Sequence, residues 1–196
     1  TEADAVTAFK HGEIDEVPFL SQSYGLENWK TAKIQKETDY NTYLAVFFNL
    51  REPIYTKNLR QALSYALDKP ADTDTRALGP ISPKSWAYLP ALKSYNKDIE
   101  RGVERMLDEP PQEKLELNLT TTSTYQLEAE SFIRQWEEFG QKAFESCQNS
   151  GDVSDKSLCE NMKITVNLKI TNFPDTSNFE MLLIGQESAP DPDQYQ

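Results

Sequence analysis

The sequence has little of what most catalytic and metal sites require. It contains one histidine, His11, and two cysteines, Cys147 and Cys159. It has no Gly-x-Ser-x-Gly, no Walker loop and no Gly-x-Gly-x-x-Gly. A zinc site is unfavourable because there is no Cys-x-x-Cys and no second histidine. We therefore expect no enzyme activity, no cofactor and no metal site.

Long apolar runs and clustered positive charge are also missing. No stretch approaches the roughly 20 apolar residues of a membrane helix. The first residues, Thr1 to Asp4, lack the basic start of a signal peptide, so we expect any signal peptide or lipid anchor to lie outside this sequence. A net charge of -12 without a Lys/Arg cluster argues against nucleic acid as a partner.

What the sequence does contain is apolar periodicity that changes between helix and strand spacing. Helices are predicted over residues 3–10, 59–67, 98–108 and 125–147, and strands over 14–17, 43–50, 115–119, 164–170 and 179–184. The run at 43–50 is nearly continuous, which is typical of a strand buried on both faces. Together these elements predict an α/β fold: an open mixed sheet with helices on both faces.

Residues 79–95 are rich in proline and aromatic residues and should form an ordered loop without regular structure. Aromatic side chains in such a loop either pack inward or face a ligand. Trp86 and Tyr88 are the main candidates.

Several segments resemble the family 5 extracellular solute-binding proteins, which are the peptide, dipeptide and nickel receptors of ABC importers. The main ones are Leu59–Lys69, Gly79–Tyr88 and the Pro-Asp-Pro-Asp of residues 190–193; further similar segments are Ala8–Asp15, Tyr43–Asn49 and Phe179–Gly185. Members of that family are much longer than this chain. The resemblance thus implies one lobe of a type II periplasmic-binding-protein-like fold.

On this resemblance, residues 1–42 are a crossover segment from a first lobe, 43–186 the second-lobe α/β domain, and 187–196 a truncated return crossover. The implied function is the ligand-binding lobe of a receptor that delivers peptides or a similar small solute to an ABC importer permease. The implied location is extracytoplasmic, in the periplasm or on the cell surface, as a lipoprotein where the envelope has one membrane. The alternative is a stand-alone extracellular interaction domain whose Trp86 loop docks a protein partner.

The resemblance also implies ligand-binding residues. Trp86 and Tyr88 match a segment along the cleft, although both rings could instead fill the core of the lobe. Asn49 ends the strand that enters the lobe, where its amide either contacts a ligand backbone or ties the two crossover strands together.

The segment that leaves the lobe departs from the family pattern. Peptide-binding relatives carry an aspartate three residues before the first acid of the Pro-Asp-Pro-Asp motif, where it pairs with the peptide α-ammonium. Here that position is Ser188, three residues before Asp191, so either the adjacent Glu187 substitutes or no free amino terminus is anchored. A carboxylate pair of Asp191 and Asp193 for hydrolysis or Ca²⁺ binding is the less favoured interpretation.

Three residues are expected to have structural roles. Arg60 at the start of its helix should pair with a carboxylate, for which Glu180 is the candidate, in preference to contacting a ligand. In an exported protein, Cys147 and Cys159 favour one local disulfide that contributes about 3 kcal/mol. Two unrelated thiols remain the alternative.

Overall fold

The computed structural model describes residues 1–18, 20, 22–70, 76–150 and 156–187. The chain divides into two compact units, Thr1–Thr38 and Asp39–Gln196. Each is described by itself. No helix among the described residues is long and apolar enough to cross a membrane.

The first unit contains helix α1 (Glu2–His11) and the short 3-10 helix η1 (Leu26–Asn28). The side chain of Thr1 caps α1 by accepting from the backbone N–H of Asp4. Gly12 ends the helix in the left-handed conformation, with φ 73°. The strand predicted at residues 14–17 is not formed, because a strand needs a hydrogen-bonding partner and none pairs with this segment.

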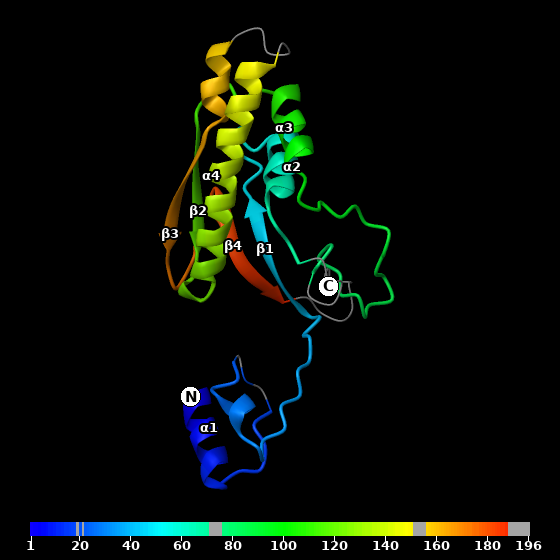
Figure 1. Ribbon diagram of the computed structural model, residues 1–196, viewed down its shortest axis with the longest axis vertical. Coiled ribbons are helices and arrows are strands. Elements are labelled where there is room, and N and C mark those ends of the chain that lie inside the picture. The colour runs from blue at the N-terminus through cyan, green and yellow to red at the C-terminus, as the bar shows by residue number, and fades with distance from the viewer. Residues whose placement is uncertain (19, 21, 71–75, 151–155, 188–196) are drawn as a thin grey trace. The chain divides into compact units, whose positions relative to one another are not determined.

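The second unit is built on a four-stranded mixed sheet with the order β1-β4-β2-β3. The strands are β1 (Thr42–Phe48), β2 (Leu115–Thr121), β3 (Ile164–Ile170) and β4 (Met181–Glu187). β1 and β4 are antiparallel, whereas β2 runs parallel to both β3 and β4. β4, which comes last in the sequence, thus enters the sheet between β1 and β2 (Figure 1).

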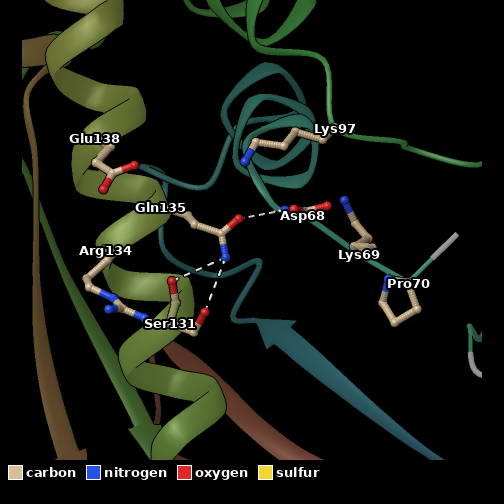
Figure 2. A pocket seen from close by; sticks show the side chains of 8 residues that line it. All are labelled: Asp68, Lys69, Pro70, Lys97, Ser131, Arg134, Gln135 and Glu138. Carbon is tan, nitrogen blue, oxygen red and sulfur yellow. Dashed lines mark hydrogen bonds between the residues drawn. The ribbon is translucent and has the colours of Figure 1, made fainter.

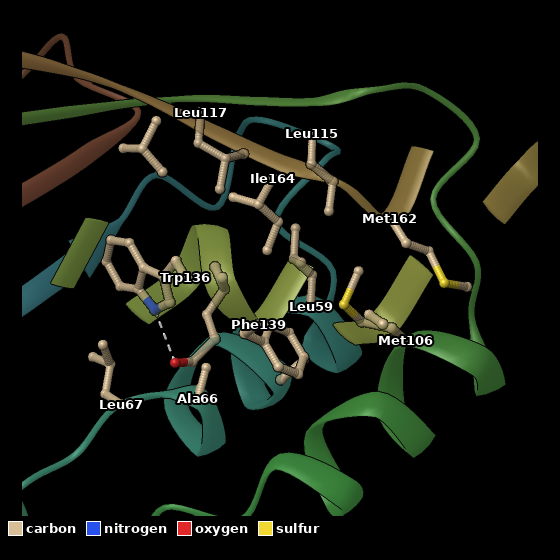
Figure 3. Close-up of a cluster of buried hydrophobic side chains, with 14 of the residues drawn as sticks. Leu59, Ala66, Leu67, Met106, Leu115, Leu117, Trp136, Phe139, Met162 and Ile164 are labelled. Atoms are coloured by element: carbon tan, nitrogen blue, oxygen red, sulfur yellow. Dashed lines mark hydrogen bonds between the residues drawn. The ribbon is translucent and has the colours of Figure 1, made fainter. Parts of the chain in front are cut away.

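Three helices supply the apolar layer that covers this sheet: α2 (Lys57–Ala66), α3 (Ile99–Asp108) and α4 (Gln126–Asn149), the last entered through the 3-10 turn η2 (Ser123–Tyr125). Alternate residues of β2 (Leu115, Leu117 and Leu119) point into a common core with these helices. Figure 3 shows Leu115 and Leu117 with Trp136 of α4 and Leu59 of α2.

Close backbone approaches and one buried hydrogen bond fix α4 in place. A Cβ on Gly140 would lie 2.5 Å from the backbone nitrogen of Ile164, so only glycine allows α4 to approach β3 this closely. The indole N–H of Trp136 donates to the carbonyl of Leu63 at 2.9 Å (Figure 3). This bond satisfies the one polar atom of a ring that is 1% exposed.

A disulfide closes the segment that follows α4. Cys147 in α4 is joined to Cys159 in the 3-10 helix η3 (Lys156–Met162), with their Cα atoms 5.6 Å apart. Both residues are fully buried. The link holds η3 against the end of α4, directly before β3 begins.

The open mixed sheet of an α/β fold is confirmed, but two details differ from expectation. The described helices of this unit pack on one face rather than on both, and the other face of β2 and β3 exposes polar residues such as Glu116 and Asn118. β1 is only partly buried because it is an edge strand, with the β4 neighbour on one side alone. The apolar run at residues 43–50 therefore predicted more burial than β1 has.

The opposite edge of the sheet is β3. There the carboxylate of Glu137, on α4, accepts a hydrogen bond from the backbone N–H of Val166 at 3.3 Å. One amide of the edge strand is therefore bonded to a helix side chain.

Candidate ligand-binding site

Asn49 lies directly after β1 and connects the two strands that form the crossover. Its Nδ2 donates to the carbonyl of Phe179 at 2.9 Å, and its Oδ1 accepts from the backbone N–H of Arg51 at 3.1 Å. Its own backbone N–H donates to the carbonyl of Glu180 at 2.8 Å. The side-chain amide of Asn49 thus uses its oxygen and one of its N–H groups in hydrogen bonds within the protein. This favours a role in holding the two crossover strands together over contact with a ligand.

The predicted pairing of Arg60 with Glu180 is wrong. Arg60 lies in the first turn of α2, and its Nη1 donates to the carbonyl of Tyr55 at 2.6 Å. The carboxylate of Glu180 accepts instead from Asn118 and, at 3.5 Å, from the hydroxyl of Tyr55. Burial first, and the charge of Glu180 second, raise the pKa of Tyr55. The bond that the structure gives Arg60 is to a backbone carbonyl.

The loop that carries Trp86 is built of successive turns. The N–H of Ser85 donates to the carbonyl of Ser82 at 2.9 Å, and the N–H of Tyr88 to that of Ser85 at 3.1 Å. Trp86 is 85% exposed, whereas Tyr88 is half-buried. The core alternative is therefore excluded for Trp86. An indole held out in water on an ordered loop is available to cover a ligand.

The return segment is described only up to Glu187. This residue ends β4 opposite Thr42 of β1, and its side chain is exposed. The predictions for Ser188 and Asp191 fall outside the described residues.

A hollow of about 600 Å³ lies between the end of α2 and the polar side of α4 (Figure 2). Charged and polar side chains line it: Asp68, Lys69, Lys97, Ser131, Arg134, Gln135 and Glu138, with Pro70. Gln135 accepts from the N–H of Asp68 at 2.6 Å and donates to the carbonyl of Ser131 at 3.3 Å. Sequence analysis missed this hollow. The polar residues spaced three and four apart on α4 were its only signal.

Lys69, which lines this hollow, donates hydrogen bonds to carbonyl groups at the C-terminal end of α2. Its ammonium donates to the carbonyls of Ser64, of Leu67 at 3.2 Å and of Tyr95 at 2.7 Å. Burial, followed by the positive charge of Arg76, lowers the pKa of Lys69 to about 8. This lysine thus joins the helix to the far end of the Trp86 loop.

Metal ligation finds no support in the described part of the chain, where no group of three or more His, Cys, Asp or Glu residues could hold an ion.

Comparison with known proteins identifies the family. The model of the bacterial extracellular solute-binding proteins, family 5 Middle, matches residues 1–189. The chain belongs to this family, as its motifs predicted. No curated protein matches the sequence.

Solved structures agree on the fold. NikZ from Campylobacter jejuni, in complex with Ni(L-His), aligns with a TM-score of 0.64 and 22% identity over 97% of this chain. The substrate-binding protein CtaP from Listeria monocytogenes aligns with a TM-score of 0.61 and 18% identity over 95% of the chain. DppA from Helicobacter pylori, in complex with the peptide STSA, aligns with a TM-score of 0.56 and 16% identity over 97% of this chain.

The alignments cover 39%, 38% and 36% of those three chains. This chain therefore spans well under half the length of the binding proteins it resembles. At such identities the likeness shows the type II periplasmic-binding-protein-like fold and not the ligand.

Proposed function

We propose that the chain is a ligand-binding lobe of an extracytoplasmic receptor, which captures peptides or a similar small solute and delivers it to an ABC importer. Membership of the solute-binding family supports the general role. The observation that carries the ligand assignment is the 85% exposure of Trp86 on an ordered loop. In a receptor that closes around its solute by hinge movement, such a ring becomes buried only when the ligand and the facing first lobe meet it.

Peptides are the favoured solute class because an aromatic face covers a peptide backbone or an apolar side chain without requiring one sequence. Among the structural neighbours, DppA from Helicobacter pylori is bound to a peptide and NikZ to Ni(L-His). The described part of this chain has no group of three or more His, Cys, Asp or Glu residues that could hold a metal ion. Tyr88 and Asn49 are secondary candidates, since one is half-buried and the other is largely used in internal hydrogen bonds.

The test is calorimetric titration of the full-length gene product with short peptides. Trp86→Ala should weaken binding about tenfold or more, because the ligand loses an aromatic surface. Phe173→Ala is the matched control, since Phe173 is 92% exposed but lies outside the Trp86 loop. Equal affinities of the wild type and the Trp86 variant would refute the contact. Binding of a protein partner but no peptide would favour the stand-alone interaction domain.

Ser188 allows a second test within the same proposal. Without a carboxylate at this position, affinity should be indifferent to acetylation of the peptide amino terminus. A retained charged hydrogen bond would instead contribute about 1.5–3 kcal/mol, which is roughly 10- to 150-fold in Kd. A strong preference for the free amine would assign the anchor to Glu187 or to another acid.

A further inference from the structure

The outer edge of β1 has no neighbouring strand. β1 pairs on one side only, with the antiparallel strand β4 (Figure 1). The N–H of Asn49 donates to the carbonyl of Glu180 at 2.8 Å, so these two residues form a hydrogen-bonded pair at the end of the ladder. Such pairs alternate along an antiparallel ladder. Leu44, Val46 and Phe48 therefore direct their backbone N–H and C=O groups away from β4.

These outward backbone groups have no hydrogen-bond partner. In the described part of the chain, no backbone or side-chain group bonds to the N–H or the C=O of Leu44, Val46 or Phe48 on the outer side of β1. A row of unpaired backbone groups along a strand is a template on which a further strand can add.

The two edges of the sheet differ in how they are protected. At β3, the carboxylate of Glu137 bonds to the amide of Val166, and Lys169 adds a charge to the strand. β1 has neither form of protection. Its seven residues include no charged residue and no proline. Natural proteins block the sheet edges that must stay unpaired, so the unblocked edge of β1 is the one at which a strand can add.

The sequence of β1 is that of an interior strand. Its apolar residues are nearly continuous, yet Leu44 is 37% exposed, and Val46 and Phe48 are only partly buried against the core. Leu50, just beyond the strand, is 68% exposed. A further strand beside β1 would make it an interior strand of the sheet, and its composition would then match its surroundings.

We propose that an extended segment of the full-length receptor, outside residues 1–196, adds to this sheet as a strand beside β1. Its backbone pairs with the outward groups of Leu44, Val46 and Phe48. The alignments cover at most 39% of the three solved relatives described above, so a receptor of their length has enough further chain to supply a strand. The inference rests on the proposed function in one respect, namely that this chain is part of a longer receptor.

A segment of the same polypeptide is favoured over a second copy of the chain for two reasons. A tethered segment is present at a high effective concentration, so that it pairs without a bimolecular step. Two copies, in contrast, would each bring a net charge of -12 to the contact and repel each other.

Amide hydrogen exchange tests the added strand without any ligand. Mass spectrometry with electron-transfer fragmentation would compare the 1–196 chain with the full-length gene product, residue by residue. In the 1–196 chain, the amides of Leu44, Val46 and Phe48 should exchange fast, whereas those of Phe47 and Asn49, which face β4, should exchange slowly. In the full-length protein the first three amides should slow by at least about tenfold, because they become hydrogen-bonded. Fast exchange of these three in both proteins would overturn the proposal.

The same measurement separates the other occupants of the edge. Slow exchange of Leu44, Val46 and Phe48 already in the 1–196 chain would overturn the proposal, and an increase in this protection with protein concentration would assign the edge to a second copy. A gene product with no residues beyond 1–196 would refute the receptor of the proposed function together with the added strand. A longer product whose β1 edge exchanges fast would refute the strand alone.

A proline variant tests the hydrogen bond itself. Val46→Pro removes an outward N–H, which is tolerated at an unpaired edge but removes a ladder bond from an interior strand. The loss of the valine side chain is common to both proteins. The thermal midpoint should therefore fall by about 2–4 °C more in the full-length protein than in the 1–196 chain.

Ala45→Pro is the matched control for this variant. The N–H of Ala45 faces β4, so its loss should lower the thermal midpoint of both proteins alike. Equal falls caused by Val46→Pro in the two proteins would refute the added strand.

Discussion

The carboxylate of Glu180 accepts two hydrogen bonds from Asn118, one from Nδ2 at 2.7 Å and one from the backbone N–H at 3.2 Å. It thereby ties the residue before β4 to β2 on the polar face of the sheet.

Glu180→Ala should lower the free energy of unfolding by about 1 kcal/mol, the usual net contribution of such bonds. Glu116→Ala is the control. It removes the same charge from the exposed face of β2 and should change stability by less than about 0.5 kcal/mol. Urea unfolding measures both, and equal effects would show that charge rather than the Asn118 bonds matters.

The disulfide between Cys147 and Cys159 should stabilise the protein by about 3 kcal/mol, because it lowers the conformational entropy of the unfolded chain. The thermal midpoint should fall on addition of reductant, and intact mass should be two hydrogen masses below the reduced value. The double variant Cys147→Ser, Cys159→Ser should lack the response to reductant. Two freely alkylated thiols in protein from an oxidising compartment would contradict the prediction.

Trp86 and Trp136 should differ sharply in quenching by acrylamide. Trp86 is 85% exposed and Trp136 is 1% exposed. Fluorescence of variants that keep one tryptophan each, with the others replaced by phenylalanine, tests this directly. Equal protection of both rings would mean that the Trp86 loop folds onto the core.

Lys69 should make stability depend on pH at alkaline values. Its folded-state pKa of about 8 lies below the ordinary 10.5 of the unfolded chain. Between these values the unfolded state holds a proton that the folded state has released, so the free energy of unfolding should rise with pH relative to Lys69→Met. Urea unfolding of both proteins at pH 8 and pH 10 gives the comparison. A difference that falls instead would show that the bonds from the ammonium to its carbonyl partners outweigh burial.

Gly185 in β4 leaves room for the hydroxyl of Tyr125. A Cβ at this position would lie 2.2 Å from that oxygen, so Gly185→Ala should destabilise the lobe by about 1–3 kcal/mol through overpacking. Tyr125→Phe removes the oxygen and should recover part of the loss in a double-variant cycle measured by thermal unfolding. Without such recovery, the cost must come from the backbone of β4 itself.

Local pattern was sufficient to predict much of this fold. The alternation of Leu115, Leu117 and Leu119 reports one buried face, and β2 has that burial pattern. The helices predicted near 59–67 and 98–108 begin within two residues of those observed, since Thr56 and Asp98 cap them.

What depends on distant partners was not predictable from the sequence. The half-burial of β1 follows from the strand order, in which its one neighbour is a strand more than 130 residues later. Arg60 and Glu180 failed to pair because Glu180 bonds to Asn118, a contact that no local spacing reveals. The exposure of Trp86 likewise could be read only from the folded loop. A segment rich in proline and aromatic residues is compatible with a ring that points into the core and with one that points into solvent.

The bond from Val166 to Glu137 bears on how copies of this protein meet each other. An exposed edge strand offers its free amides as a template for a strand of another chain, and natural proteins block such edges to avoid aggregation. Here one amide of β3 is already bonded to a helix carboxylate, and Lys169 places a charge further along the same strand. These two features make the β3 edge a poorer template for a strand of a second copy.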